Sequence, residues 1–256
     1  MLSMTRMVAS CTVTSIVFAS TASAAVVFDN LANRSTNIYS VSGTSNVTWY
    51  AVYADNASNL ATLNLNQLKV SIYKSAGFTG CTLNAFVATA NGTDLASAYP
   101  TLVAPGSTEP AYTSIGTISL SANGGASAVA STATFGDGVT TKASIALNNS
   151  WSTHGCFFVG FQFVGNSATS TLRAALYRST GTTAGSATTT VGAIDNVFWS
   201  SASSVTGAVT GPGGFTASTT SSNVGCLSVA GNLVPAPGAL AVLGVAGLIG
   251  ARRRRH

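Results

Sequence analysis

The sequence predicts an all-β protein, an antiparallel β-sandwich with jelly-roll-like connections. Apolar and polar residues alternate in short runs that are rich in β-branched and aromatic side chains, which is the pattern of half-buried strands. Glycine and asparagine separate these runs at the short spacing typical of sandwiches. No long amphipathic helix is expected outside the two ends of the chain, so the strands are expected to pack on one another.

We expect roughly nine or ten strands. In chain order they are residues 47–53, an alternation over 63–66 that resumes at 68–73, then 83–87, 115–120, 129–135, 143–147, 156–164, 172–177 and 193–199. Glycine-containing turns are expected at residues 91–92, 123–125, 136–138 and 165–166. The run 156–164, CFFVGFQFV, is apolar almost throughout and predicts a central strand that is buried on both faces.

The first 24 residues have the pattern of an export signal. Arg6 is the only charge before a moderately apolar run over residues 7–18, which is too short and too rich in Ser and Thr to span a bilayer comfortably. Ala22 and Ala24 fit the small-x-small rule for signal peptidase. We therefore predict cleavage after Ala24 and a mature chain that begins at Ala25.

The last residues predict a short membrane segment. Pro235 and Pro237 prevent a helix from continuing through them, because proline lacks an N–H group. Residues 239–251 are apolar, and a helix of that length spans roughly 20 Å of a hydrocarbon core that is about 30 Å thick. Because this segment is short, insertion in the inner membrane is expected to be marginal and transient. The arginines that follow hold the tail on the cytoplasmic side.

This tail resembles the PEP-CTERM sorting signal of Gram-negative bacteria. The resemblance covers only residues 234–256, and it rests on a Pro-x-Pro element, a short apolar helix and a terminal arginine cluster. The residues that carry it are Val234, Pro235, Pro237, Gly238, Arg252, Arg253, Arg254 and Arg255. It implies processing by an exosortase, a membrane cysteine protease-transpeptidase that cuts near Pro-x-Pro and releases or re-attaches the body. Ala236 replaces the usual Glu, which leaves the exosortase subtype open. An ordinary membrane tail without processing is the alternative.

Four segments follow from these observations. Residues 1–24 are the signal peptide, residues 25–199 the β-sandwich domain, and residues 234–256 the sorting signal. Residues 200–233 are rich in Ser, Thr and Gly and predict a flexible stalk, with an edge hairpin as the alternative.

The charges of the body balance. The whole chain carries a formal charge of +5, but Arg6 and the four terminal arginines account for five of the 11 basic residues. Between residues 25 and 233, six basic residues face six acidic ones, so no net charge remains. No nucleic-acid partner is therefore expected, since phosphate binding needs clustered positive charge. The low net charge is compatible with self-association.

Three cysteines remain in the mature body: Cys81, Cys156 and Cys226. In an oxidising compartment two of them are expected to form a disulfide and the third to remain a thiol. The sequence does not choose among the three pairings. They lie too far apart along the chain to resemble a metal-binding cluster.

No catalytic pattern stands out, and the sequence predicts a protein that is not an enzyme and needs no cofactor. His154 is the only histidine between residues 25 and 233, and no Gly-x-Ser-x-Gly elbow is present. Asp29 and Asp195 follow apolar residues near the two ends of the predicted domain, so they are candidates for a structural calcium site. The alternative is that each closes a turn.

The sequence predicts an exported, non-enzymatic protein of the cell surface or extracellular matrix, associated with exopolysaccharide or biofilm. Its partners would be signal peptidase and an exosortase. A carbohydrate-binding module is the alternative, and a secreted hydrolase a remote one. Sugar binding would use aromatic side chains, of which many are expected to pack in the core: Trp49, Tyr50, Tyr53, Tyr73, Trp151, Tyr177 and Trp199.

Overall fold

The computed structural model shows an all-β protein with antiparallel sheets. It describes residues 24–39, 47–54, 60–89, 112–147, 155–167, 169, 172–179, 193–201, 215–218 and 225–235. The strands are β1 (Ala25–Asp29), β2 (Arg34–Tyr39), β3 (Val47–Ala54), β4 (Leu60–Lys74), β5 (Cys81–Thr89), β6 (Tyr112–Leu120), β7 (Val129–Phe135), β8 (Ala143–Ala146), β9 (Gly155–Val164), β10 (Ala174–Ser179), β11 (Ala193–Ser201), β12 (Phe215–Ser218) and β13 (Leu227–Pro235). A single 3-10 turn, η1 (Leu31–Asn33), is the helical element of the described residues.

The first sheet, called sheet A here, is organised around β4. Its order is β1-β13-β4-β10-β2, and β7 and β8 also pair with β4. The 15 residues of β4 therefore pair with four strands, β13, β10, β7 and β8. On one edge β13 pairs with residues 60–70 and β10 with residues 72–74; on the other edge β8 pairs with residues 62–65 and β7 with residues 68–74.

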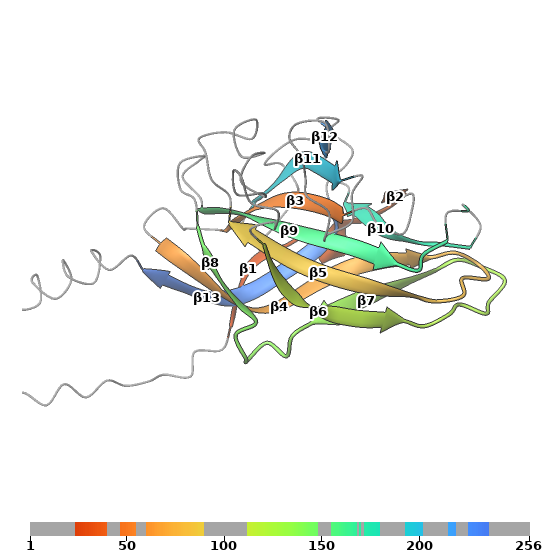
Figure 1. The fold of residues 1–256 in the computed structure, drawn as a ribbon, viewed down its shortest axis with the longest axis horizontal. Coiled ribbons are helices and arrows are strands. Elements are labelled where there is room, and N and C mark those ends of the chain that lie inside the picture. Colours follow the sequence, from red (N-terminus) through yellow and green to blue (C-terminus); the bar gives the residue numbers. More distant parts are fainter. Residues whose placement is uncertain are drawn as a thin grey trace, which may run out of the picture.

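The second sheet, sheet B, has the order β12-β11-β3-β9-β5-β6, and its pairings are antiparallel. Figure 1 shows strands of sheet B, such as β5 and β9, stacked over β4 and β13 of sheet A. The chain crosses repeatedly between the sheets, since β3, β5 and β9 belong to sheet B while β4 and β10 belong to sheet A. The alternation of the sequence thus produces two layers, each with one face turned inward.

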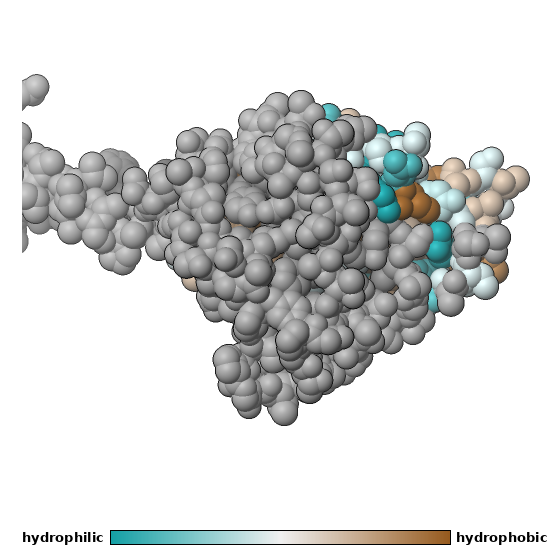
Figure 2. Space-filling view, turned by 90° about the horizontal axis from the view of Figure 1, so that it is seen from above, coloured by the Kyte–Doolittle hydropathy of each residue, from teal (hydrophilic) through white to brown (hydrophobic). Residues whose placement is uncertain are grey.

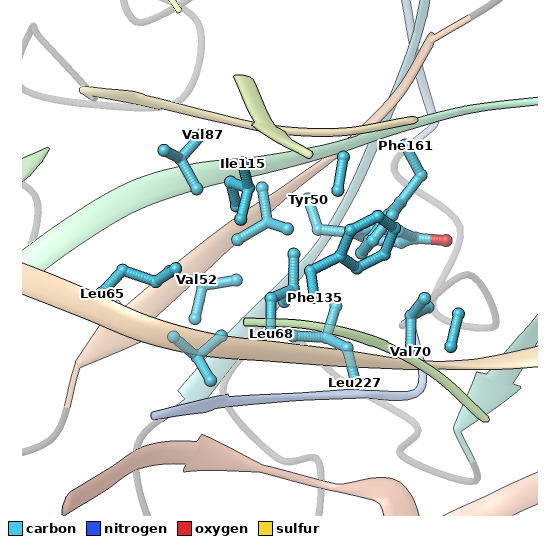
Figure 3. Packing of buried hydrophobic residues seen from close by; sticks show 14 of the residues in the cluster. Tyr50, Val52, Leu65, Leu68, Val70, Val87, Ile115, Phe135, Phe161 and Leu227 are labelled. Carbon is cyan, nitrogen blue, oxygen red and sulfur yellow. The ribbon is translucent and has the colours of Figure 1, made fainter. Parts of the chain in front are cut away.

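The core lies between the two sheets. Figure 3 shows Leu65, Leu68 and Val70 of β4 pointing toward side chains of sheet B such as Val52 and Ile115. Phe161 of β9 and Tyr50 of β3 lie in the same layer, with ring centroids 6.4 Å apart. Burial of these side chains is the main favourable contribution to folding, at roughly 1.5–3 kcal/mol for each large aliphatic or aromatic residue.

The prediction for residues 156–164 is confirmed. Every residue of β9 from 156 to 163 is buried, and Val164 at its end is exposed. Phe157, Val159 and Phe161 point into the inter-sheet core, while the alternate residues Phe158 and Gly160 lie on the outer face of sheet B. There the ring of Trp49 packs directly on Gly160, so close that a Cβ at position 160 would lie 2.6 Å from it.

The structure differs from the sequence prediction over residues 200–233. β12 pairs with β11, as the edge-hairpin alternative expected for part of this range. β13, however, lies between β1 and β4, and Leu227 and Val229 are fully buried. Residues 227–233 are therefore neither stalk nor edge hairpin. Their alternation is hidden by neighbouring Ser, Thr and Gly, and β13 derives its stability from pairing on both of its edges.

The predicted signal peptide and the apolar helix of the tail lie outside the described residues. In the part of the chain that the structure describes, no helix is long and apolar enough to cross a membrane. Of the sorting signal, Val234 and Pro235 are described. Both lie at the end of β13, where they pair with Thr62 and Leu60 of β4.

We expect Gly136→Ala to destabilise the protein by more than about 1 kcal/mol. Gly136 lies in the predicted turn at 136–138 with a φ of +85°, and a Cβ there would collide with the carbonyl oxygen of Asn66. Gly124→Ala is the matched control, because a Cβ at that position meets nothing within 4 Å. Urea unfolding measures both, and equal midpoints for the two variants would contradict the described turn.

Candidate functional site

The outer face of sheet A carries an accessible aromatic pair with a cation beside it. The rings of Tyr73 and Tyr177 meet edge to face, with centroids 5.9 Å apart and an interplanar angle of 79°. The guanidinium carbon of Arg34 lies 5.0 Å from the centroid of the Tyr177 ring, within the range of a cation–π interaction. Both tyrosines are partly exposed and Arg34 is exposed. We call these three residues the Tyr–Arg patch.

Three neighbouring strands bring the patch together. Tyr73 stands on β4, where Val70 and Ile72 point into the core, so the alternate residues Lys69 and Tyr73 face outward. Tyr177 on β10 faces outward by the same alternation, because Leu176 is in the core. β2 lies at the edge of sheet A and pairs with β10, which brings Arg34 opposite residue 179.

Hydroxyl groups border the patch on β7. Thr132 and Thr134 are exposed, while Ala133 between them is buried in the core, so the two threonines face outward. Thr132 pairs with residue 71 and Thr134 with Lys69. Lys69 lies four residues before Tyr73 on the same face, about 13 Å away along the strand. The outer face thus presents aromatic, cationic and hydroxyl groups together.

The charges of the body are distributed unevenly between the sheets. All six basic residues lie on strands of sheet A or directly before one: Arg34, Lys69, Lys74, Lys142, Arg173 and Arg178. Sheet A and its described turns contain two acids, Asp29 and Asp137, which leaves a balance of six minus two, or +4. The strands of sheet B carry a single charged residue, Asp195. The neutral total conceals a basic sheet.

Buried polar groups lie beneath the patch. Cys226, fully buried, precedes β13 at the point where β10 leaves β4, and its backbone N–H donates to the carbonyl of Tyr177 at 3.2 Å. Burial raises the pKa of the Cys226 thiol to about 12, although Arg34 acts in the opposite direction. Burial also raises the pKa of the Tyr177 phenol, again opposed by Arg34. Both groups are therefore neutral at physiological pH.

The expected disulfide is not present: Cys81, Cys156 and Cys226 are not bonded to one another. Cys81 begins β5, and the next residue, Thr82, pairs with Val164 at the end of β9. Cys156 lies near the start of β9. The two are separated by about 30 Å along the strands, far beyond the roughly 7 Å that a disulfide allows between Cα atoms. Cys226 lies in the other sheet.

We expect the same number of alkylated cysteines in the unfolded protein with and without reductant. In the native protein Cys81 and Cys226 should react slowly with iodoacetamide at pH 8, because burial raises their pKa to about 11 and about 12 and little thiolate is present. The rate for the partly exposed Cys81 should rise about tenfold per pH unit through pH 10, whereas the fully buried Cys226 should stay protected. Two additional alkyl groups after reduction, counted by mass spectrometry, would contradict the described thiols.

Asp29 closes a turn, as the alternative to a calcium site expected. Its Oδ1 accepts a hydrogen bond from the backbone N–H of Leu31 at 2.9 Å. Residue 195 stands on β11 of sheet B, whereas Asp29 stands on β1 of sheet A, and the side chain of Asp195 lies outside the described residues. Across the described ranges, no group of three or more His, Cys, Asp or Glu side chains could hold a metal ion.

The neighbouring Asn30 has the larger structural role, which sequence reasoning missed. It is 2% exposed, its Nδ2 donates to the carbonyl of Gly225 at 2.8 Å, and its Oδ1 accepts from the N–H of Leu227 at 2.8 Å. Its backbone N–H also donates to the carbonyl of Leu227. Asn30 thereby fixes the start of β13 against the end of β1.

Asn30→Ala is expected to lower the free energy of unfolding by about 1–3 kcal/mol, because it leaves buried backbone groups without partners. Asp29→Ala removes one partly buried hydrogen bond and should cost less, about 1 kcal/mol. Thermal unfolding with calcium and with chelator completes the test. A larger loss for Asp29→Ala, or a calcium-dependent stabilisation that this variant abolishes, would restore the calcium interpretation.

The aromatic residues proposed as sugar platforms separate into groups. Trp49 and Tyr50 are buried, at 3% and 1% exposure, and so offer no free face. On the outer face of sheet B, Trp49 packs with Phe86 and Tyr112 beside hydrogen-bonded amides of Asn84 and Gln162. The side chains of Tyr53, Trp151 and Trp199 and the position of His154 lie outside the described residues.

Of the candidates whose side chains the structure describes, Tyr73 and Tyr177 are therefore the accessible ones. Arg34 and Lys69 were missed as partners, because the sequence suggested only that charges cancel. Alternation within 68–73 could have placed Lys69 beside Tyr73, but nothing local links Arg34 to Tyr177. Figure 2 shows, at the described end of the surface, small hydrophobic areas bordered by hydrophilic ones.

No protein-family model matches the chain, and neither the curated proteins nor the solved structures include a match.

Proposed function

We propose that this protein is an exported, non-enzymatic component of the cell surface or extracellular matrix that associates with exopolysaccharide. Residues 1–24 direct export, and residues 234–256 are a sorting signal of the PEP-CTERM type that an exosortase processes after transient insertion in the inner membrane. The body between them is a jelly-roll-like sandwich that needs no cofactor.

One observation supports this assignment above the others. β13 is a fully integrated strand of sheet A, and it ends at Pro235, the first proline of the Pro-x-Pro element. A cut within or after this element would leave β13 with all its described pairings to β1 and β4. The last described strand thus reaches the Pro-x-Pro element, and a cut there would leave every described strand in the body.

The Tyr–Arg patch favours the second candidate, a carbohydrate-binding module. Partly exposed tyrosine rings stack on the apolar faces of sugars, and neighbouring hydroxyl and cationic groups bond to sugar hydroxyls and acids. This candidate shares the fold and the export route with the first. It differs in requiring saturable binding by the isolated protein.

Deletion of residues 236–256 tests the sorting proposal. We expect the truncated protein to accumulate in the medium instead of at the cell surface, because it keeps every described strand but lacks the membrane segment and the arginines. Immunoblotting of medium and cell fractions measures the distribution. An unchanged distribution would contradict the proposed address.

A longer deletion, of residues 227–256, is the control for folding. It removes β13, whose pairings with β1 and β4 are the largest contribution of the C-terminal region to sheet A. This variant should be degraded or insoluble, whereas the shorter deletion should unfold at the same urea concentration as the intact body. Together they separate loss of sorting from loss of structure.

A further inference from the structure

The outer face of sheet A combines two properties that the balanced charge of the body conceals. It carries Tyr73 and Tyr177, the accessible tyrosines among the described platform candidates, and it also carries two basic residues, Arg34 and Lys69. We propose that the Tyr–Arg patch, together with Lys69, binds an acidic polysaccharide, with sugar rings on the tyrosines and carboxylates on the cations.

The geometry of the patch suits a ring that bears an acid group. The edge-to-face arrangement of Tyr73 and Tyr177 leaves a corner between two aromatic surfaces. Arg34 lies over Tyr177, so its planar guanidinium is held beside the ring while its N–H groups remain able to donate to a carboxylate. A sugar stacked at this corner would bring its carboxylate to the guanidinium.

A second contact distinguishes a polymer from a single sugar. Lys69 faces outward on β4 about 13 Å from Tyr73, which is farther than one sugar ring extends. The exposed Thr132 and Thr134 lie on the strand alongside, where they can bond to sugar hydroxyls. Cations at both ends of this row fit a chain whose acid groups repeat.

A nucleic acid is the competing polyanion, because bases also stack on tyrosines and phosphates also bond to arginine. The observations favour the polysaccharide. Asp29 lies on the same face: it pairs with Ser228, which in turn pairs with Lys69. This carboxylate partly offsets the charges of Arg34 and Lys69, so the net positive charge of the face is small. Binding to the phosphate backbone needs a denser track of cations.

The proposal rests on the proposed association with polysaccharide and names the class of polymer. It is tested with the protein purified from the cells that produce it, by calorimetry with polygalacturonate, with its methyl ester, which lacks the charge, and with a single-stranded DNA oligonucleotide. We expect saturable, salt-sensitive binding to polygalacturonate and weaker binding, by about tenfold or more, to the ester and to the DNA.

Matched variants locate the site. Arg34→Gln should weaken binding to polygalacturonate about tenfold or more, and Tyr177→Ala should weaken it by about fivefold or more. Lys142→Gln removes an exposed charge elsewhere in sheet A and should leave binding unchanged. The urea midpoint of each variant shows whether it folds, and salt titration of the unaltered protein provides a readout that needs no variant.

Several outcomes would overturn the proposal. These are no binding to polygalacturonate, equal binding to the ester or to DNA, and equal effects of Arg34→Gln and Lys142→Gln in folded proteins. None of them affects the localisation experiment with the deletion of residues 236–256. Failure of sorting and failure of binding are therefore distinguishable.

Discussion

β4 is the strand on which sheet A depends. It pairs with four strands, two along each edge, and its inward residues supply the floor of the core. The strands that share it come from distant parts of the sequence, so their pairing closes long loops and carries a large entropy cost. Burial of the inward residues against sheet B offsets this cost, which makes the two layers one cooperative structure.

The outward residues of the same strand form the candidate site. Because alternation is strict, the burial that places Val70 and Ile72 in the core also places Lys69 and Tyr73 on the outer surface. The junction where β10 leaves β4 and β13 joins it then positions Tyr177 above the buried Cys226. The site is therefore set on strands, which hold side chains more rigidly than loops do.

Local patterns predicted much of this fold but not its connections. Strands such as β3, β7 and β9 were predicted because alternation and β-branched residues are local signals. β13 was missed because its short alternation lies next to a Ser/Thr/Gly-rich stretch, and only pairing with β1 and β4 reveals it. The disulfide was expected from the number of cysteines and the oxidising compartment, and neither contains the roughly 30 Å along the strands that separates Cys81 of β5 from Cys156 of β9.

The candidate site was less predictable than the fold. Tyr73 and Tyr177 could be named from sequence, but their contact joins residues more than a hundred positions apart. The segregation of charge between the sheets likewise depends on which strands pair. A count of charges that sums to zero cannot show it, because it contains no information about position in space.

The central claim is that both ends of the chain are removed as addresses and that the cut at the Pro-x-Pro element leaves β13 in the body. The intact mass of the protein isolated from its producing cell tests this most directly. The account predicts a chain that begins at Ala25 and ends within the Pro-x-Pro element, with or without an attached group. A mass equal to all 256 residues would contradict it.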